Sequence, residues 1–355
     1  MKVAGYPGVK TQPFSLSTAC TTEGKLTRQI DENTEDRVSP FRTQLKSGLR
    51  AGTRKGWSSF GWICKLLLPT AFLVTLVQWG GLLSQVEYLL NPLMRLINLP
   101  GEAALPIISG MLIGPYTTIA IITVIPFTLG QMTLIAIFVM IAHSLIVEGI
   151  IQHKSGINVA KITPIRIAAA ILAVLVVSQF FADTTQGVVV PPELMATTPF
   201  IEVLKTWAID MGRLLIKVFI IIMAVMIGLE SLKSLGWMEY LLNFSQPVMK
   251  ILGLSHRTAL LWVTAVVFGL LYGGAVIIEE AKKGALTKAE LERLHISIGI
   301  NHSMVEDPAL YLALGLNGFW LWVPRFVMAV IAVQVYRATK YLKKESFQRW
   351  MVRNR

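Results

Sequence analysis

The sequence has 355 residues and a formal net charge of +12. Of these residues, 54% are hydrophobic and only 15% charged, whereas a soluble domain has about 25% charged residues. This composition excludes an ordinary soluble protein and indicates a membrane protein. The basic residues cluster near the two ends of the chain, as is typical beside membrane spans, so we expect anionic lipid and no nucleic acid as their partner.

The first 57 residues have no apolar stretch that could be a signal peptide. They are rich in Ser, Thr, Gly and charged residues, which predicts a flexible cytoplasmic arm over 1–57. Within it, Arg42, Lys46, Arg50 and Arg54 recur every four residues and predict a short basic helix on the membrane surface. The two cysteines, Cys20 and Cys64, form neither a disulfide framework nor a metal-binding motif.

Apolar segments follow along the rest of the chain, and several reach the roughly 20 residues that a membrane span needs. The second and the sixth are interrupted by glycines. The segments lie at about 60–83, 103–126, 129–151, 163–182, 208–230, 258–278, 296–316 and 318–338.

The second half of the chain repeats the first. The two repeats, 58–182 and 207–340, are joined by a loop at 183–206 and followed by a basic tail at 341–355. Residues match in order across two small insertions, with offsets of 152, then 155, then 159. The matches are 87–91 with 239–243, Pro92 with Pro247, Gly110 with Gly269, Gly114 with Gly273, Thr128 with Thr287, His143 with His302, Ser144 with Ser303, and Arg166 with Arg325.

The distribution of Lys and Arg predicts the orientation of the repeats. Neither 96–153 nor 167–204 contains a Lys or Arg, which places the loop at 183–199 outside the cell and both termini in the cytoplasm. Repeat one therefore crosses the membrane an odd number of times, although it has four apolar segments. One segment should not cross, and the glycine-broken one is the natural candidate.

We therefore expect an all-α polytopic membrane protein with two inverted-topology repeats, about six spans and two re-entrant hairpins. The hairpin tips are predicted at Gly110, Gly114, Gly269, Gly273 and Gly274. Close helix packing of small residues is the alternative explanation for these glycines. Segments 85–98 and 237–252 resemble interfacial amphipathic helices. Inverted repeats with broken helices are a recurrent transporter design.

Polar residues inside the apolar segments mark the candidate site, because ionisable groups are costly there and usually face a cavity or a partner. His302 and Glu306 are four residues apart on one helix face, whereas His143 and Glu148 are less well aligned. The alternative is that each pair is an internal hydrogen bond between helices. The candidate substrate- or ion-binding residues are His143, Ser144, Glu148, Asn301, His302, Ser303, Glu306 and Asp307.

Other chemistry has less support in the sequence. We expect Arg166 and Arg325 to be interfacial anchors and Lys217 to extend its charge toward the membrane surface. The histidines and acids lack a metal-ligand spacing, so no metal site is predicted. No nucleotide-binding or zinc-protease motif is present, so we expect neither an enzyme nor a cofactor.

The stretch from Tyr272 to Gly274, followed by 301–308, resembles the nucleoside-recognition, or Gate, domain family. The resemblance is strongest over 258–315 and reaches about 60–182 through the repeat. Relatives include concentrative nucleoside transporters, the membrane part of ferrous-iron permeases and spore maturation proteins. The resemblance implies hairpins and broken helices around a central site in a bacterial-type inner membrane. The chain lacks a GTPase domain and gate cysteines, which counts against an iron permease.

Two functions follow as hypotheses. One is a transporter for a small polar solute, with nucleoside-like solutes as one candidate class, driven by an ion gradient. The other is a membrane-embedded assembly protein that transports nothing and that acts as a homo-oligomer or with a membrane partner. A polar cavity at which the hairpin tips and the two His-Ser pairs converge would favour the first hypothesis.

Overall fold

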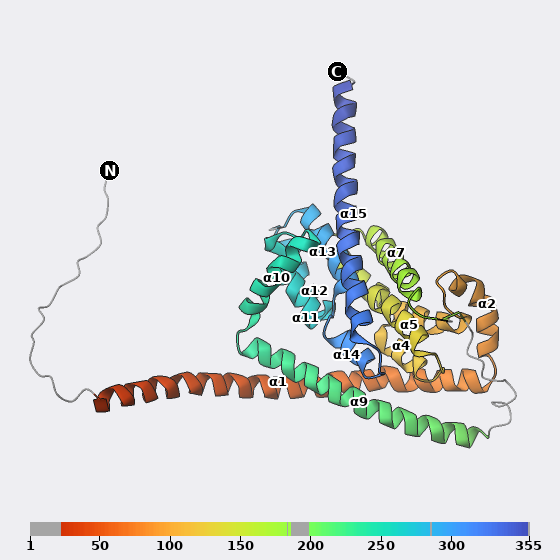
Figure 1. Cartoon of the computed structure of the whole chain (residues 1–355), viewed down its shortest axis with the longest axis horizontal. Coiled ribbons are helices and arrows are strands. Elements are labelled where there is room, and N and C mark those ends of the chain that lie inside the picture. The colour runs from red at the N-terminus through yellow and green to blue at the C-terminus, as the bar shows by residue number, and fades with distance from the viewer. Residues whose placement is uncertain (1–22, 183, 186–198, 285, 354–355) are drawn as a thin grey trace, which may run out of the picture.

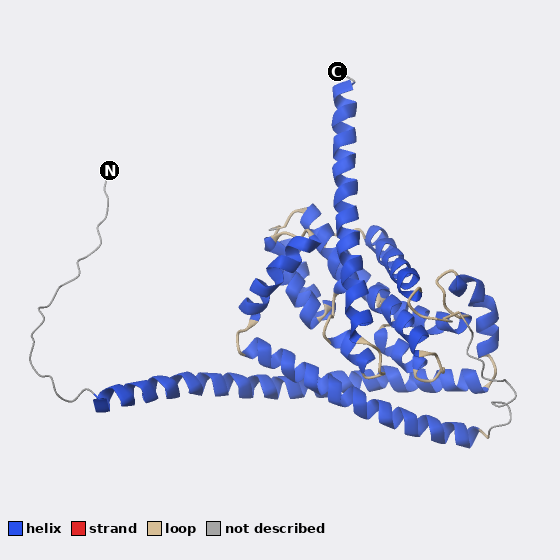
Figure 2. Cartoon of the chain, in the orientation of Figure 1, coloured by secondary structure: helices blue, strands red, loops and turns tan. Residues whose placement is uncertain are grey.

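The structure is a computed structural model that describes residues 23–182, 184–185, 199–284 and 286–353. The described part of the chain is helical and contains no strand (Figure 2). This confirms the prediction of an all-α protein. Most of the predicted extracellular loop at 183–199 lies outside the described residues.

The helices fall into two sets with the same order. Repeat one comprises α1 (Glu23–Trp79), α2 (Leu83–Arg95), α3 (Ala104–Leu112), α4 (Pro115–Ile122), α5 (Leu129–Ala142), α6 (Leu145–Lys154) and α7 (Val159–Ser178). Repeat two comprises α9 (Phe200–Ser234), α10 (Met238–Leu252), α11 (Ala259–Phe268), α12 (Leu270–Lys282), α13 (Lys288–Asn301), α14 (Glu306–Leu312) and α15 (Gly318–Arg353). Short 3-10 turns, Gly101–Ala103 and His256–Thr258, precede α3 and α11.

The first helices of the two repeats, α1 and α9, pack against each other from Gly48 to Trp79 of α1 and form one side of the molecule (Figure 1). Phe72 contacts Trp207, and Trp79 contacts Phe200, so residue numbers rise along α1 as they fall along α9. Because the two helices are equivalent in the repeats, this antiparallel pairing gives the repeats opposite orientations. The inverted topology expected from the charge distribution is thus present in the fold.

The prediction of a flexible arm over 1–57 is wrong for residues 23–57, which form the first part of α1, and residues 1–22 lie outside the described residues. Gly48 and Gly52 lie so close to α9 that a Cβ atom would be 2.6 Å from Ser231 Cα and 2.5 Å from Ile227 Cα. Lys55 also forms an ion pair with the buried Glu230. Small residues at four-residue spacing permit this close approach of two helices. The basic residues Arg42, Lys46, Arg50 and Arg54 lie in the same helix, α1, and do not form a separate short helix.

The structure also corrects the alignment of the repeats. Gly81 and Gly236 have left-handed backbones with φ near 70°, and Asn98 and Gly253 are likewise left-handed. The offset is 155 in both cases. The offset of 155 holds as far as the hairpin breaks at Gly114 and Gly269. The sequence match of 87–91 with 239–243, at an offset of 152, is therefore shifted by about one helical turn from the structural equivalence. The four-residue insertion lies beyond the breaks, where α12 is longer than α4.

Each glycine-broken segment folds as a helical hairpin, α3–α4 in repeat one and α11–α12 in repeat two. The arms have 8 to 13 residues, about 12–20 Å, too short to cross a bilayer alone. The chain turns at Gly114, with φ of 150°, and at Gly269, with φ of 82°. These two predicted tips are therefore the breaks.

The prediction is wrong for the other three glycines, which lie within helical arms. A Cβ on Gly110 would collide with Thr118 and Val139, and one on Gly273 would lie 2.9 Å from Ala265 Cα. Gly274 packs against Ile151 of α6. Close packing, the alternative explanation, accounts for these three positions.

Behind the hairpins, α5 and α13 occupy the centre of the core. Each begins with a capping box, in which Thr128 pairs with Gln131 and Thr287 with Glu290. The central helix of each repeat packs against the last helix of the other, α5 against α15 and α13 against α7. Each central helix also packs against the last helix of its own repeat and against the other central helix, which brings the C-terminal ends of α5 and α13 together.

Within the described residues, five helices are long and apolar enough to cross a membrane. They are Phe41–Trp79, Leu129–Lys154, Val159–Ser178, Phe200–Ser234 and Gly318–Leu342. The counterpart of Leu129–Lys154 in repeat two is α13 with α14. Its first turns carry four charged residues, Lys288, Glu290, Glu292 and Arg293, which lower its hydropathy below that of a typical span. The sequence predicted a sixth span at 296–316, and this segment is not among the five.

Candidate functional site

His143 and His302, the last residues before breaks in the two central helices, meet in the core. Their Nε2 atoms are 3.0 Å apart, and both side chains are buried. The Nδ1 atom of His143 hydrogen-bonds the carbonyl of Val139 at 3.0 Å, and that of His302 bonds Ile298 at 2.7 Å. A carbonyl can only accept, so each Nδ1 carries a proton and each Nε2 is left to face the other histidine.

The residue after each histidine breaks the helix and holds the hairpin. Ser144 and Ser303 have left-handed backbones, with φ of 48° and 49°, which is uncommon for serine. The amide of Ser144 donates to Gly110 O at 3.1 Å, and the amide of Ser303 donates to Ala265 O at 3.2 Å. These bonds satisfy carbonyls at the end of the first hairpin arm, which have no partner within their own helix.

Arg166 and Arg325 are part of this site, so the prediction that they are interfacial anchors is wrong. Both are almost completely buried. Arg166 donates to Ile141 O and His143 O at 3.1 Å each, and Arg325 donates to His302 O at 2.6 Å. The guanidinium groups thus cap the C-terminal ends of α5 and α13, where the helix dipole favours a positive charge. Their match at offset 159 was the sequence signal for this role.

The acids that approach the histidines are Glu148 and Asp307, which are equivalent in the two repeats. Glu148 Oε1 lies 3.1 Å from His302 Nε2 and 3.4 Å from His143 Nε2. Asp307 Oδ2 lies 3.7 Å from His143 Nε2. The spacing argument that paired His302 with Glu306 is wrong, because the break after His302 turns α14 away from the face of α13. We call His143, Glu148, His302 and Asp307 the histidine site.

Glu306 instead accepts a hydrogen bond of 2.6 Å from the hydroxyl of Tyr116, the second residue of α4. Tyr116 in turn packs edge-on against Trp62 of α1, with ring centroids 5.4 Å apart. The bond between Tyr116 and Glu306 therefore links hairpin one (α3–α4) to the first turn of α14, beside the histidine site. Tyr116 was not singled out by the sequence, because a tyrosine after Gly114-Pro115 has no distinctive pattern.

Repeat two leaves several buried polar atoms without a hydrogen bond. Among the described residues, Asp307 Oδ2, Asn301 Oδ1 and both Nε and Nη1 of Arg325 have none. In repeat one, all three nitrogens of Arg166 are bonded, one of them to Glu148 at 2.6 Å. Buried polar groups are normally satisfied, so the repeat-two half of the site has unused capacity to bind a polar species.

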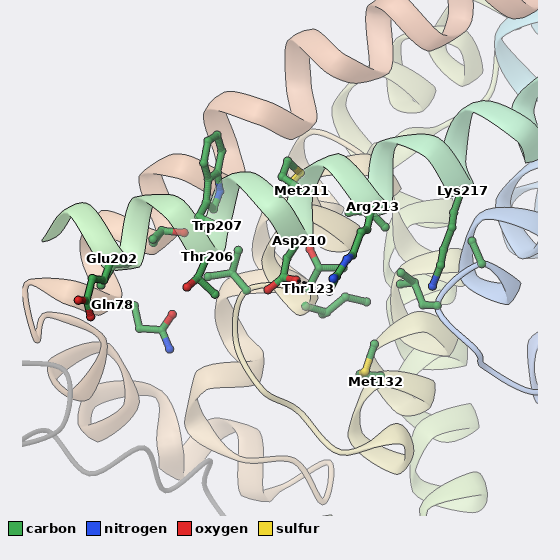
Figure 3. A pocket seen from close by; sticks show the side chains of 17 residues that line it. Gln78, Thr123, Met132, Glu202, Thr206, Trp207, Asp210, Met211, Arg213 and Lys217 are labelled. Atoms are coloured by element: carbon green, nitrogen blue, oxygen red, sulfur yellow. Dashed lines mark ion pairs between the residues drawn. The ribbon is translucent and has the colours of Figure 1, made fainter. Parts of the chain in front are cut away.

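A groove of about 700 Å³ runs between the α1–α9 pair and the core (Figure 3). Charged side chains of α9 line it, and Asp210 and Arg213 form an ion pair of 3.6 Å. Lys217, predicted to extend toward the membrane surface, also lines the groove. Further lining residues include Gln78, Thr123, Met132, Glu202, Thr206 and Trp207.

The groove and the histidine site are separate. The groove ends against Ala313 and Leu314, just past the C-terminal end of α14. Glu306 and Asp307 form the first turn of that helix, which has 7 residues and is about 10 Å long. The hairpin breaks and the two His-Ser pairs thus converge as predicted, but the histidines are buried and do not line the groove.

Three groups of the histidine site could hold a metal ion together. One ligand atom from each of His143, Glu148 and His302 lies within 4.8 Å of the others. All three residues are buried. The sequence predicted no metal site, because these residues come from two repeats and their spacing along the chain shows no pattern.

The fold and the site thus belong to an all-α membrane protein. The chain is similar to an uncharacterized membrane protein of Bacillus subtilis, YvoD. The two are 26% identical over 288 residues, which cover 80% of this chain and 91% of YvoD. The sequence matches no family model. No solved structure matches it.

Proposed function

We propose that the chain is a multi-pass transporter for a small polar solute, with the histidine site at its centre and the groove as its access path. One observation carries the proposal: His143 and His302, equivalent residues of two inverted repeats, meet at 3.0 Å where two helices are broken. Broken helices in inverted repeats expose backbone groups and dipole ends that bind solutes and ions in transporters.

The electrostatics of the site support the same proposal. The N-terminal ends of α6 and α14 carry Glu148, Glu306 and Asp307 in their first turns. Four buried ionisable groups from both repeats, Glu148, Arg166, Asp307 and Arg325, lie against the two histidines, and the partly buried Glu306 is beside Asp307 in the chain. Burying so many charges is costly in a bilayer and is typical of a substrate or ion pathway.

The groove supports access from one side. It lies beside the C-terminal end of α1 and the N-terminal end of α9, the helix that follows in sequence the connection at 183–199, which the charge distribution places outside. The histidine site is closed off from it by α14. A covered central site with an open path beside it on one side fits alternating access. The resemblance to the Gate family gives nucleosides as the first solutes to test.

Uptake into proteoliposomes tests the proposal directly. After Cys20 and Cys64 are replaced by serine, a single cysteine is introduced at Thr206, which lines the groove, or at Ile209, which is exposed on α9 outside it. The panel contains nucleosides, small anions and divalent metals. We expect uptake of at least one solute class, which a bulky maleimide at position 206 abolishes and the same maleimide at position 209 leaves unchanged.

The burial of the two histidines favours a second candidate, a membrane-embedded assembly protein that does not transport. In that case the ionic network only joins the two repeats. Vesicles with correctly folded protein would then take up every solute of the panel no faster than empty vesicles. The same rate of uptake after modification at 206 would separately exclude the groove as the access path.

A further inference from the structure

We infer that the histidine site binds one divalent first-row transition-metal ion, held by His143 Nε2, His302 Nε2, Glu148 Oε1 and Asp307 Oδ2. Metal binding at this site does not depend on the transport proposed above. It is measurable in detergent, where no transport takes place.

The first argument is the spacing of the donor atoms. A tetrahedral site with bonds of about 2.0–2.1 Å places its donors about 3.3–3.4 Å apart. The three distances among His143 Nε2, His302 Nε2 and Glu148 Oε1 are 3.0, 3.1 and 3.4 Å. One face of a tetrahedron is thus nearly formed by donors of two repeats.

The second argument is the orientation of the histidines. A histidine that binds a metal through one nitrogen usually donates its other N–H to a carbonyl or a carboxylate, which fixes the ring. Both Nδ1 atoms make such a bond here, to Val139 O and Ile298 O. Two unprotonated Nε2 atoms therefore point at one another, and two lone pairs at this distance repel unless a cation lies between them.

The third argument is the state of the two carboxylates. One oxygen of Glu148 accepts from Arg166 at 2.6 Å, which orients the other oxygen toward the histidines. Asp307 Oδ2 is buried, lies 3.7 Å from His143 Nε2 and has no hydrogen bond. The other three donors alone all lie within 4.8 Å of one another, so Asp307 must move toward the ion to supply the fourth ligand.

The donor set also limits the kind of metal. Imidazole and carboxylate suit Zn²⁺, Fe²⁺, Co²⁺ and Mn²⁺, whereas Ca²⁺ and Mg²⁺ prefer oxygen donors alone. The buried guanidinium groups of Arg166 and Arg325 repel a cation and weaken the site. We therefore expect reversible binding, weaker than that of closed structural zinc sites.

The test measures binding of Zn²⁺ and Co²⁺ by the purified full-length chain without a histidine tag. Equilibrium dialysis gives the stoichiometry, and the visible absorption of Co²⁺ reports a tetrahedral site. We expect one ion per chain, no binding in His143→Ala and His302→Ala, and unchanged binding in His256→Ala, a control outside the site. Asp307→Asn should weaken binding about 10–100-fold.

Asp307→Asn keeps the test decisive if an alanine variant does not fold, because it conserves size and removes no hydrogen bond. If no ion binds stoichiometrically at millimolar metal, the inference is overturned. A proton shared between the two Nε2 atoms would then explain their close approach. Equal binding in the wild type and Asp307→Asn would exclude Asp307 as a ligand. Uptake without metal binding, or binding without uptake, separates this inference from the proposed transport.

Discussion

Glu148 and Asp307 occupy equivalent positions in the two repeats, yet only Glu148 reaches its arginine. Glu148 Oε2 lies 2.6 Å from Arg166 Nη1, whereas Arg325 Nη1 and Asp307 Oδ2 have no hydrogen bond among the described residues. The side chain of Asp307 is one methylene shorter. The two repeats have the same fold, but the buried arginine and the buried carboxylate form an ion pair in repeat one only.

This asymmetry predicts unequal effects of two isosteric substitutions. Glu148→Gln leaves the guanidinium of Arg166 buried without its carboxylate, and removal of one partner of a buried ion pair costs about 3–5 kcal/mol. Asp307→Asn breaks no hydrogen bond and should cost at most about 1 kcal/mol. Thermal unfolding in detergent with a metal chelator measures both. Equal losses of stability would show that the two carboxylates contribute alike.

The hairpin breaks predict a second pair of effects. A Cβ on Gly269 would lie 2.8 Å from Ser303 Oγ and one on Gly114 3.1 Å from Ser144 Oγ, both on backbones with positive φ. Gly269→Ala and Gly114→Ala should each destabilise the protein by about 1–3 kcal/mol, with Gly269→Ala the more severe. Gly228→Ala, in α9 with nothing within 4 Å, is the matched control. A larger loss of thermal stability in Gly228→Ala than in Gly269→Ala would contradict this account.

The contact between α1 and α9 gives a third prediction. A side chain at Gly52 meets the backbone of Ile227, which cannot move without shifting α9. Gly52→Leu should therefore separate the two helices and lower the yield of monodisperse protein severalfold. Gly61→Leu is the control in the same helix, because a Cβ at Gly61 would meet no atom of another element within 4 Å. Size-exclusion chromatography compares them, and similar yields would mean that the glycines do not determine the packing.

The sequence was sufficient for the helical class, the repeat and the convergence of the histidines. These features rest on hydrophobic segments and on residue identities that recur, such as the Thr128 and Thr287 caps. The register of the hairpins was not predictable, because a shift of about one helical turn keeps the same face of an amphipathic helix. Arg166 was misplaced since its partners Glu148 and Ile141 are defined only by the fold. The four-residue spacing of His302 and Glu306 predicted that they share a helix face, which is wrong because the helix breaks between them.

The orientation in the membrane is the last prediction. The base of hairpin two carries Lys282, Lys283, Lys288 and Arg293, whereas 120–135 at the base of hairpin one has no basic residue, so hairpin two should enter from the cytoplasm. In a variant without Cys20 and Cys64, a cysteine at the exposed Lys283 should resist an impermeant maleimide added to intact cells. A cysteine at Glu202, which lines the groove, should react with it. A permeant maleimide must label both positions as the control. Labelling of 283 from outside, with 202 protected, would reverse the proposed orientation and place the groove on the cytoplasmic side.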